Sequence, residues 1–205
     1  MSEPDPRTTA YVWFDTEYST LELESAVLLQ VAAVVTDADL QRIFPPEDDL
    51  RLHIKLAEGT TLSPWVEEHL QDLVAACRSE DAVDLSEADA RLAELVGRVP
   101  KAGNEMTYRP VLAGNSVHCD WWLARKFLPR FIAQLHYRHL DVTAVKLQWQ
   151  DLHAGPEFAK DGPEELLAYL PGPKELLEGK PHDAYYDVLA SIAELNYYRQ
   201  QFFKK

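Results

Sequence analysis

Three short apolar runs near the start of the chain predict three strands in succession. Tyr11–Phe14 and Val27–Val35 are rich in β-branched and aromatic residues, which favours strands, at least one of them largely buried. In residues 50–56, leucine and isoleucine alternate with charged or polar residues, a period of two that is typical of a half-exposed strand. Because the connections are short, we expect an antiparallel meander.

Beyond the third strand, the apolar positions change to the period of helices over residues 63–77 and 86–99. The first segment opens with Ser63 as a possible N-cap and a proline at the first helical position. The second opens with Ser86 followed three residues later by Asp89, a pattern typical of a helix cap. Each segment then places its apolar residues on one face: Val66, Leu70, Leu73 and Val74 in the first, and Leu92, Leu95, Val96 and Val99 in the second.

The rest of the chain alternates between strand and helix. Residues 110–115 and 139–142 indicate short strands, residues 120–128 a helix, and residues 182–203 a closing helix with Val188, Ile192 and Leu195 on one face. Three strands followed by alternating elements predict an α/β fold, a mixed sheet flanked by helices. A chain of 205 residues is long enough for one core, so we expect a single domain over residues 11–205 after a polar tail over residues 1–10.

The proline-rich residues 148–180 interrupt this pattern. Two short pieces, Pro163–Tyr169 and Pro173–Leu177, have helical character, and the segment as a whole is predicted to be a loop excursion or a lid.

Charge and cysteine content narrow the possible functions. The formal net charge is −14, so the long-range field repels polyanions such as long RNA, and a role with nucleic acid depends on local contacts or metal ions. Cys77 and Cys119 lie far apart without a CxxC spacing, which gives neither a zinc site nor a disulfide framework. With neither a signal-like start nor an apolar run long enough to cross a membrane, we expect a soluble, cytoplasmic protein with no membrane partner.

An acidic pair at the end of the first strand suggests a metal site. Residues two apart in a strand point to the same face, so Asp15 and Glu17 would present both carboxylates on one side. Carboxylate oxygens are the ligands that a hard divalent cation such as Mg²⁺ prefers. Taken alone, such a pair is more often solvated surface.

Three more residues offer suitable chemistry, each with a plainer alternative. Asp120 follows the Gly-Asn-Ser end of a predicted strand, where a helix-capping turn is the alternative. His182 and Asp187 can face one cleft if His182 precedes the closing helix and Asp183 caps it. The alternatives are an exposed loop histidine and an aspartate that favours the positive helix start.

Taken in order, these five residues resemble the DEDDh superfamily of 3′-to-5′ exonucleases, and within it the oligoribonucleases. The resemblance extends to three longer blocks, "LAGNSVHCDWWLARKFLP", "LHYRHLDVTAVK" and "DVLASIAELNYYRQQF". It implies a ribonuclease-H-like fold, with Asp15, Glu17, Asp120 and Asp187 around two divalent cations, Mg²⁺ or Mn²⁺, and His182 as the general base. The product would be a nucleoside 5′-monophosphate released from a 3′ end.

The resemblance also implies substrate contacts and a homodimer. Leu21 would wedge against the bases, while Ser116, Arg138 and Thr143 would bind the 5′ phosphate of a very short single-stranded RNA. Tyr137 would reach in from a second subunit, and a looser alignment places a nucleotide contact at His69.

Departures from the family pattern leave two alternatives open. The chain has "DTEYSTL" where the family has Asp-Leu-Glu-Met-Thr-Gly-Leu, and Gln30 where a glutamate is usual. The first alternative is a broader DEDDh exonuclease that trims longer single-stranded RNA or DNA. The second is a catalytically silent nucleic-acid-binding or interaction module.

Overall fold

A computed structural model describes residues 10–100, 106–153, 157–160, 162–177 and 179–202. The predicted tail over residues 1–10 lies, apart from Ala10, outside this part of the chain. Five strands form one sheet in the order β3-β2-β1-β4-β5. They are β1 (Tyr11–Tyr18), β2 (Leu28–Thr36), β3 (Leu50–His53), β4 (Val111–Gly114) and β5 (His139–Asp141).

The first three strands pair antiparallel, which confirms the meander, and β4 and β5 run parallel to β1. β1 continues beyond Phe14 to Tyr18, so Asp15 and Glu17 lie inside the strand and not just after it. The extension follows from β2, whose nine residues are all buried and pair along the whole of β1.

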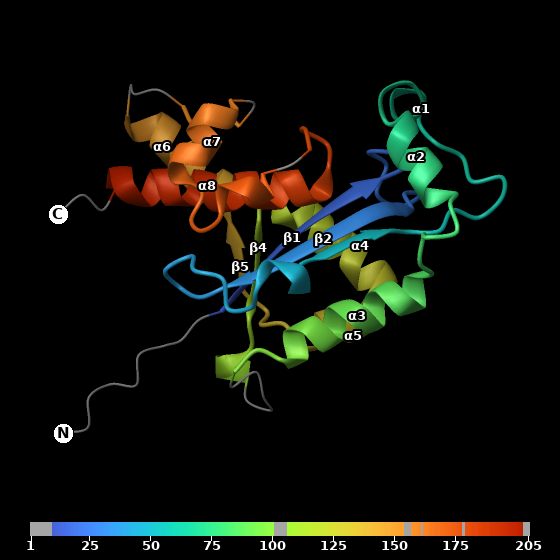
Figure 1. Cartoon of the computed structure of the whole chain (residues 1–205), viewed down its shortest axis with the longest axis horizontal. Coiled ribbons are helices and arrows are strands. Elements are labelled where there is room, and N and C mark those ends of the chain that lie inside the picture. Colours follow the sequence, from blue (N-terminus) through green and yellow to red (C-terminus); the bar gives the residue numbers. More distant parts are fainter. Residues whose placement is uncertain (1–9, 101–105, 154–156, 161, 178, 203–205) are drawn as a thin grey trace.

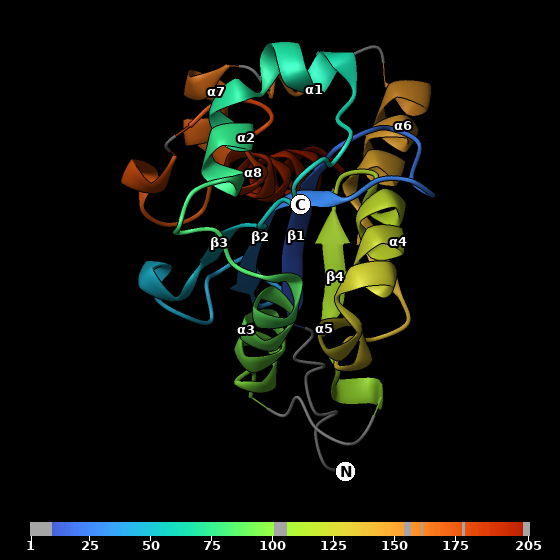
Figure 2. The same cartoon turned by 90° about the vertical axis from the view of Figure 1, so that its right-hand side faces the viewer.

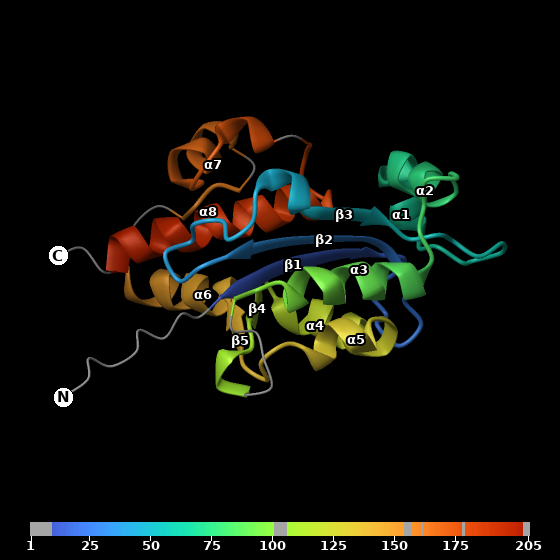
Figure 3. The same cartoon turned by 60° about the horizontal axis from the view of Figure 1, so that its bottom comes forward.

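Helices cover both faces of the sheet, which confirms the predicted α/β fold with a mixed, helix-flanked sheet. The eight helices of the described residues are α1 (Pro64–His69), α2 (Gln71–Cys77), α3 (Leu85–Gly97), α4 (Val117–Phe127), α5 (Pro129–Ala133), α6 (Val142–Leu152), α7 (Pro163–Tyr169) and α8 (Ala184–Phe202). Figure 1 shows α8 across one face, with α6 and α7 beside it and α1 and α2 beyond one end of the sheet. Figures 2 and 3 show α3, α4 and α5 on the opposite face.

Of two predicted helix starts, the structure confirms one and contradicts the other. Ser63 caps α1 as expected, because its hydroxyl accepts from the Val66 N–H, but the helix breaks at Leu70 and resumes as α2. The cap predicted at Ser86 is wrong, since α3 begins at Leu85 and its N-cap is Asp84, two residues earlier. Asp89 instead lies buried on α3 and accepts hydrogen bonds from the first turn of α5.

The described part of residues 148–180 packs on the outer side of α8. The first helical piece is α7 as predicted, and the second is a 3₁₀ turn at Lys174–Leu176. Phe158, Leu166 and Leu170 are buried there in the same apolar cluster as the α8 side chains. Because α8 touches both the sheet and this layer, most of its residues are buried, not only the predicted stripe.

Among the described helices, none combines the length and the apolar character that a membrane crossing requires.

Asp89→Ala should lower the free energy of unfolding by about 1–3 kcal/mol, the cost of leaving buried donors unsatisfied. The Asp89 carboxylate accepts from the backbone N–H groups of Arg130 and Phe131 at 3.1 and 2.9 Å, and both bonds are lost in the alanine variant. Urea titration followed by circular dichroism measures the effect. Asp89→Asn is the matched control and should lose less, because its amide oxygen still accepts. Equal stability of wild type and Asp89→Ala would contradict this account.

Candidate active site

Three carboxylates meet where β1 passes the start of α8. The side chains of Asp15, Glu17 and Asp187 each offer an oxygen, and these atoms lie within 4.8 Å of one another. The period of two along β1 places the first two on one face of the sheet, as predicted, and α8 brings the third to that face. The structure thus brings together three of the predicted metal ligands.

The cap of α8 fixes Asp187 and His182 relative to each other. The Asp183 carboxylate accepts from the N–H groups of Tyr185 and Tyr186, so the helix begins at Ala184 and His182 precedes it. The His182 N–H then donates to the Asp187 carboxylate at 2.9 Å. This turn requires a left-handed backbone at His182, where φ is 67°. The geometry is the one that allows both side chains to face one cleft.

Asp120 joins the cluster from the opposite face of the sheet. It lies buried on α4, and its carboxylate accepts a hydrogen bond of 2.6 Å from the Thr16 hydroxyl. Thr16 stands between the two acidic residues of β1 and therefore points to the other face. This bond holds the third acidic residue of the predicted set at the edge of the same cleft, beyond the group of three.

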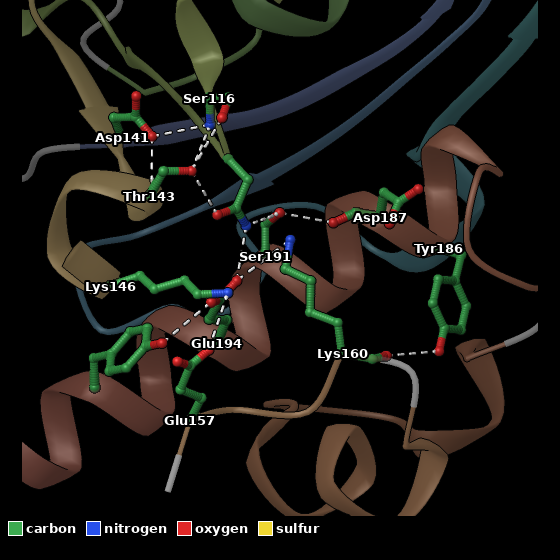
Figure 4. Close-up of polar contacts among 12 residues, drawn as sticks. Ser116, Asp141, Thr143, Lys146, Glu157, Lys160, Tyr186, Asp187, Ser191 and Glu194 are labelled. Carbon is green, nitrogen blue, oxygen red and sulfur yellow. Dashed lines mark hydrogen bonds and ion pairs between the residues drawn. The ribbon is translucent and has the colours of Figure 1, made fainter. Parts of the chain in front are cut away.

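The end of β4 supplies a second group of polar residues. A Cβ on Gly114 would lie 2.8 Å from the Phe14 carbonyl oxygen, so glycine is what allows β4 to approach β1 this closely. Ser116 follows with a left-handed backbone, φ 48°. Its N–H donates to the Asp141 carboxylate at 3.0 Å and to the Thr143 hydroxyl at 2.9 Å, as drawn in Figure 4.

Burial and mutual repulsion dominate the electrostatics of the carboxylates. Burial, followed by the charges of Asp120, Asp187 and Glu17, raises the pKa of Asp15 well above its usual value. Burial, followed by the charges of Asp187, Asp120 and Asp183, raises the pKa of Glu17 to about 8. Burial raises the pKa of Asp120 to about 7 against the opposing hydrogen bonds from Thr16, and it also raises the pKa of Asp187. Such a group is compensated by bound protons or by a cation.

One cleft of about 800 Å³ contains most of the predicted site. Its lining includes the five catalytic candidates together with Leu21 and Ser116. Leu21 is 87% exposed, and it shares the lining with Trp65, which is 45% exposed. The Trp65 ring stands edge-on to the His182 ring, with 5.0 Å between centroids.

Four predicted contacts lie outside that lining. Thr143 contacts the lining through its hydrogen bonds to Ser116 and Asn115. Tyr137 and Arg138 are exposed, with the guanidinium 5.6 Å from the tyrosine ring. His69 stacks on Trp65 at 5.0 Å and lines a neighbouring cavity of about 560 Å³ that shares His182 with the main cleft.

Sequence reasoning missed several residues of the site. Trp65 carries no signal beyond being an aromatic residue at a helix start, and Thr16 was noted only as a departure from the family pattern, with no contact assigned to it. Gln30 was noted only as a departure. Its amide oxygen accepts from the Ala184 N–H at 3.0 Å and its nitrogen donates to Asp183 at 3.3 Å, so it joins β2 to the start of α8.

Comparison with known proteins identifies relatives that are exonucleases. The family model RNase T, described as exonuclease, matches residues 12–195. The oligoribonuclease of Corynebacterium glutamicum is 32% identical over 215 residues, covering 99% of this chain and 88% of that protein. The mitochondrial oligoribonuclease of Homo sapiens is 31% identical, covering 95% and 73%. The probable oligoribonuclease of Schizosaccharomyces pombe is 32% identical, and the chain spans 66% of its length.

Solved structures share the fold. The zinc-bound complex of E. coli exonuclease I with single-stranded DNA superposes with a TM-score of 0.69 at 18% identity, over 95% of this chain and 41% of that one. Exonuclease I of Methylocaldum szegediense gives 0.65 at 21% identity. This chain spans less than half the length of either solved chain, 41% in both cases.

The family match over most of the chain, the shared fold and the clustered carboxylates agree with one another. The chain belongs to the RNase T family of 3′-to-5′ exonucleases, which are metal-dependent phosphodiester hydrolases.

Proposed function

We propose that this exonuclease hydrolyses very short oligoribonucleotides, dinucleotides above all, to nucleoside 5′-monophosphates. The observation that carries the proposal is one cleft of about 800 Å³ that is lined by the carboxylates, His182, Leu21 and Ser116 together. This volume lies in the range of pockets that enclose a small ligand. The net charge of −14 fits a substrate that needs no long basic groove, and the curated relatives named oligoribonuclease support the same substrate class.

The donor set fits divalent cations. Asp15, Glu17 and Asp187 offer oxygens within 4.8 Å of one another, and Asp120 lines the same cleft. Hard, oxygen-rich sites of this kind suit Mg²⁺ or Mn²⁺, and we assign two ions to these four residues. When bound, such ions stabilise the charge that develops on the attacking and leaving oxygens.

His182 is the proposed general base. Its imidazole would take the proton from the water that attacks the phosphorus, while the 3′ oxygen leaves. Two contacts hold it in place: the backbone bond to Asp187 and the edge-on contact of its ring with Trp65. Leu21 lines the same cleft as Trp65 and is largely exposed, which suits the proposed contact with the bases.

We assign the 5′ phosphate to Ser116, Thr143 and Arg138. Ser116 and Thr143 are joined to each other at the cleft, while Arg138 stands exposed beside Tyr137. A guanidinium gives a phosphate two donors in a rigid fork, so Arg138 suits a terminal phosphate. His69 is the remaining proposed nucleotide contact, from the adjoining cavity.

A homodimer accounts for the exposure of Tyr137. This side chain is 68% exposed, and the same part of the chain exposes Leu147 and Leu152 on α6. We propose that a second copy covers Tyr137 and that this side chain enters the site of that copy, because symmetric dimers are the commonest oligomers.

Activity on longer single strands is the second candidate function. It is favoured by the exonuclease I structure in complex with single-stranded DNA, although that likeness concerns the fold. Membership of a family of metal-dependent hydrolases argues against the alternative of a catalytically silent module.

Divalent cations should stabilise the protein and be required for hydrolysis. Carboxylates with raised pKa values, such as Glu17 at about 8 and Asp120 at about 7, bind protons more readily folded than unfolded. In EDTA, therefore, stability from these groups rises as the pH falls from about 8 toward about 5. At pH 8, Mg²⁺ at a hundred times its Kd should restore about 2.7 kcal/mol per site. Urea titrations across pH measure both effects.

The matched control is Glu17→Gln, which should flatten the pH dependence in EDTA. Asp15→Ala and Asp187→Ala should remain folded, lose the Mg²⁺ stabilisation and lose hydrolysis. Hydrolysis that persists in excess EDTA would contradict a metal-dependent mechanism.

His182→Ala should lower kcat by about 10²–10⁴, the usual contribution of a general base. The apparent affinity for Mg²⁺ should change little, because the carboxylates are intact. Stopped assays of dinucleotide hydrolysis over a Mg²⁺ titration separate the two quantities. A variant with wild-type kcat would place the base elsewhere.

A series of 5′-phosphorylated RNAs of increasing length tests the proposed substrate. We expect the dinucleotide to have the highest kcat/KM, with affinity falling as nucleotides are added. Arg138→Ala should flatten this preference by about 1.5–3 kcal/mol, as for one charge-assisted hydrogen bond. Arg125→Ala, on α4, serves as the control for loss of an arginine. Equal rates on short and long strands would favour the broader exonuclease.

Mixing two inactive variants tests the shared site. Tyr137→Ala and Asp15→Ala each damage both sites of their own homodimer, but a heterodimer contains one site with an intact Asp15 and an intact Tyr137. With random exchange, roughly a quarter of all sites should recover, by two-fold symmetry. Hydrolysis is measured in the mixture, and mass spectrometry shows in parallel that the subunits have exchanged. Exchange without recovery would mean that Tyr137 acts in its own chain or not at all.

A further inference from the structure

A lysine from the segment between α6 and α7 reaches a fully buried glutamate of α8 (Figure 4). The ammonium of Lys160 lies 3.3 Å from the Glu194 carboxylate, whose side chain has no exposed surface, while the lysine side chain is 29% exposed. Neither residue belongs to the cleft lining described above. A buried carboxylate is costly unless it is paired and hydrogen-bonded, so this pair needs a structural or functional reason.

The position of Lys160 is set by α8 itself. Two residues before it, Phe158 is buried against the Tyr197 ring, with 5.5 Å between centroids. The Tyr186 hydroxyl, one residue before Asp187, donates to the Lys160 carbonyl oxygen at 3.1 Å. The Lys160 backbone is thus fixed near Tyr186 in the first turn of α8, and its side chain extends to Glu194, further along that helix.

Glu194 fixes the orientation of the Asn115 side chain. The Asn115 amide nitrogen donates to Glu194 at 3.0 Å and to the Ser191 hydroxyl at 2.8 Å. Because a carboxylate only accepts hydrogen bonds, the asparagine must turn its NH₂ group toward Glu194 and its carbonyl oxygen away. The Tyr198 hydroxyl donates to the other carboxylate oxygen at 3.3 Å, which helps to hold Glu194 in place.

The orientation of Asn115 in turn decides which donors face the cleft. Its carbonyl oxygen accepts the hydroxyl proton of Thr143 at 3.1 Å. A hydroxyl has one proton to donate, so the Thr143 oxygen is left to accept from the Ser116 N–H at 2.9 Å. The Ser116 hydroxyl, 3.2 Å from the same oxygen, is therefore the donor of the Ser116–Thr143 pair. Its proton is free to turn to a bound phosphate, because the Ser116 N–H continues to donate to the Thr143 oxygen.

The same asparagine is tied to the carboxylate cluster. Ser191, which accepts from Asn115, donates to the Asp187 carbonyl oxygen at 2.8 Å. The positive charge of Lys160 also opposes the rise in the pKa of Asp15 and of Asp187.

We propose that Lys160 is a positioning residue that, through Glu194 and Asn115, orients Ser116 and Thr143 for the terminal phosphate of a short substrate. The inference rests on the proposed function, because it names the element that prepares the 5′-phosphate site. It assigns a task to residues 157–160 of the proline-rich segment, which the reaction itself does not use. Lys160 acts through Glu194 and does not touch the substrate.

Three variants test this chain of contacts: Lys160→Met, Glu194→Gln and the double variant. Lys160→Met leaves the Glu194 carboxylate without its cation. It should raise KM for a 5′-phosphorylated dinucleotide about 10- to 100-fold, as for loss of one charge-assisted contact, with kcat little changed. KM for the 5′-hydroxyl dinucleotide should stay within about twofold. In the double variant the neutral glutamine needs no cation and still accepts from Asn115, so the low KM should return.

Controls and a binding measurement accompany the kinetics. Arg91→Met removes one positive charge from an exposed ion pair on α3 and should leave KM unchanged for both dinucleotides. Calorimetric titration of the phosphorylated dinucleotide into His182→Ala, with and without Lys160→Met, should show the same loss of affinity without turnover. Hydrolysis of the p-nitrophenyl ester of thymidine 5′-monophosphate, which lacks the second nucleotide, should be unaffected by Lys160→Met.

Several results would overturn the inference. Equal losses on both dinucleotides would place Lys160 at the scissile phosphate, and so would a double variant no better than Lys160→Met. Unchanged KM in Lys160→Met would leave the pair without this task. A wild-type enzyme that makes no distinction between phosphorylated and hydroxyl dinucleotides would instead overturn the proposed 5′-phosphate site, and the inference with it.

Discussion

The structure depends on keeping four carboxylates close together against their mutual repulsion. Backbone pairing of β1 with β2 fixes Asp15 and Glu17, and the Thr16 hydroxyl holds Asp120 from the other face. The N–H of His182 holds Asp187. These restraints act on the backbone or come from separate elements, namely the β1–β2 pairing for Asp15 and Glu17, Thr16 for Asp120 and His182 for Asp187, so protonation of one carboxylate leaves the framework of the rest intact. This arrangement keeps a cation site formed before any cation arrives.

Local patterns predicted the parts of this site that local geometry controls. The period of two in β1 placed the acidic pair, and the Asp183 cap placed His182 and Asp187, because both depend on residues close in sequence. Helix caps that act between elements were beyond such reasoning. The sequence places Asp89 in the first turn of its own helix, yet its carboxylate accepts hydrogen bonds from the first turn of α5, some forty positions later.

The environment of Lys160 and Glu194 could not be predicted for the same reason. Lys160 sits in a stretch whose proline content indicates only a loop, and Glu194 falls within a helix whose other residues read as one apolar stripe. Their pairing, and the hydrogen bond between Glu194 and Asn115 just after β4, form only when α8 is enclosed between the sheet and the α6–α7 layer. An amphipathic pattern places the polar residues of a helix in solvent. Because α8 is enclosed, its polar residues instead find partners within the protein.

Gln30 ties the middle of the sheet to the start of α8 with both ends of one amide. A glutamate at that position would set a second carboxylate against Asp183 and would lose the donor that Asp183 receives. The identities of these two residues are therefore linked: a chain with an acid at position 30 needs a different neighbour at position 183, or a different helix start. Substitution of residue 30 or residue 183 by the residue of a relative therefore preserves the hydrogen bonds at the start of α8 only when both positions are changed together.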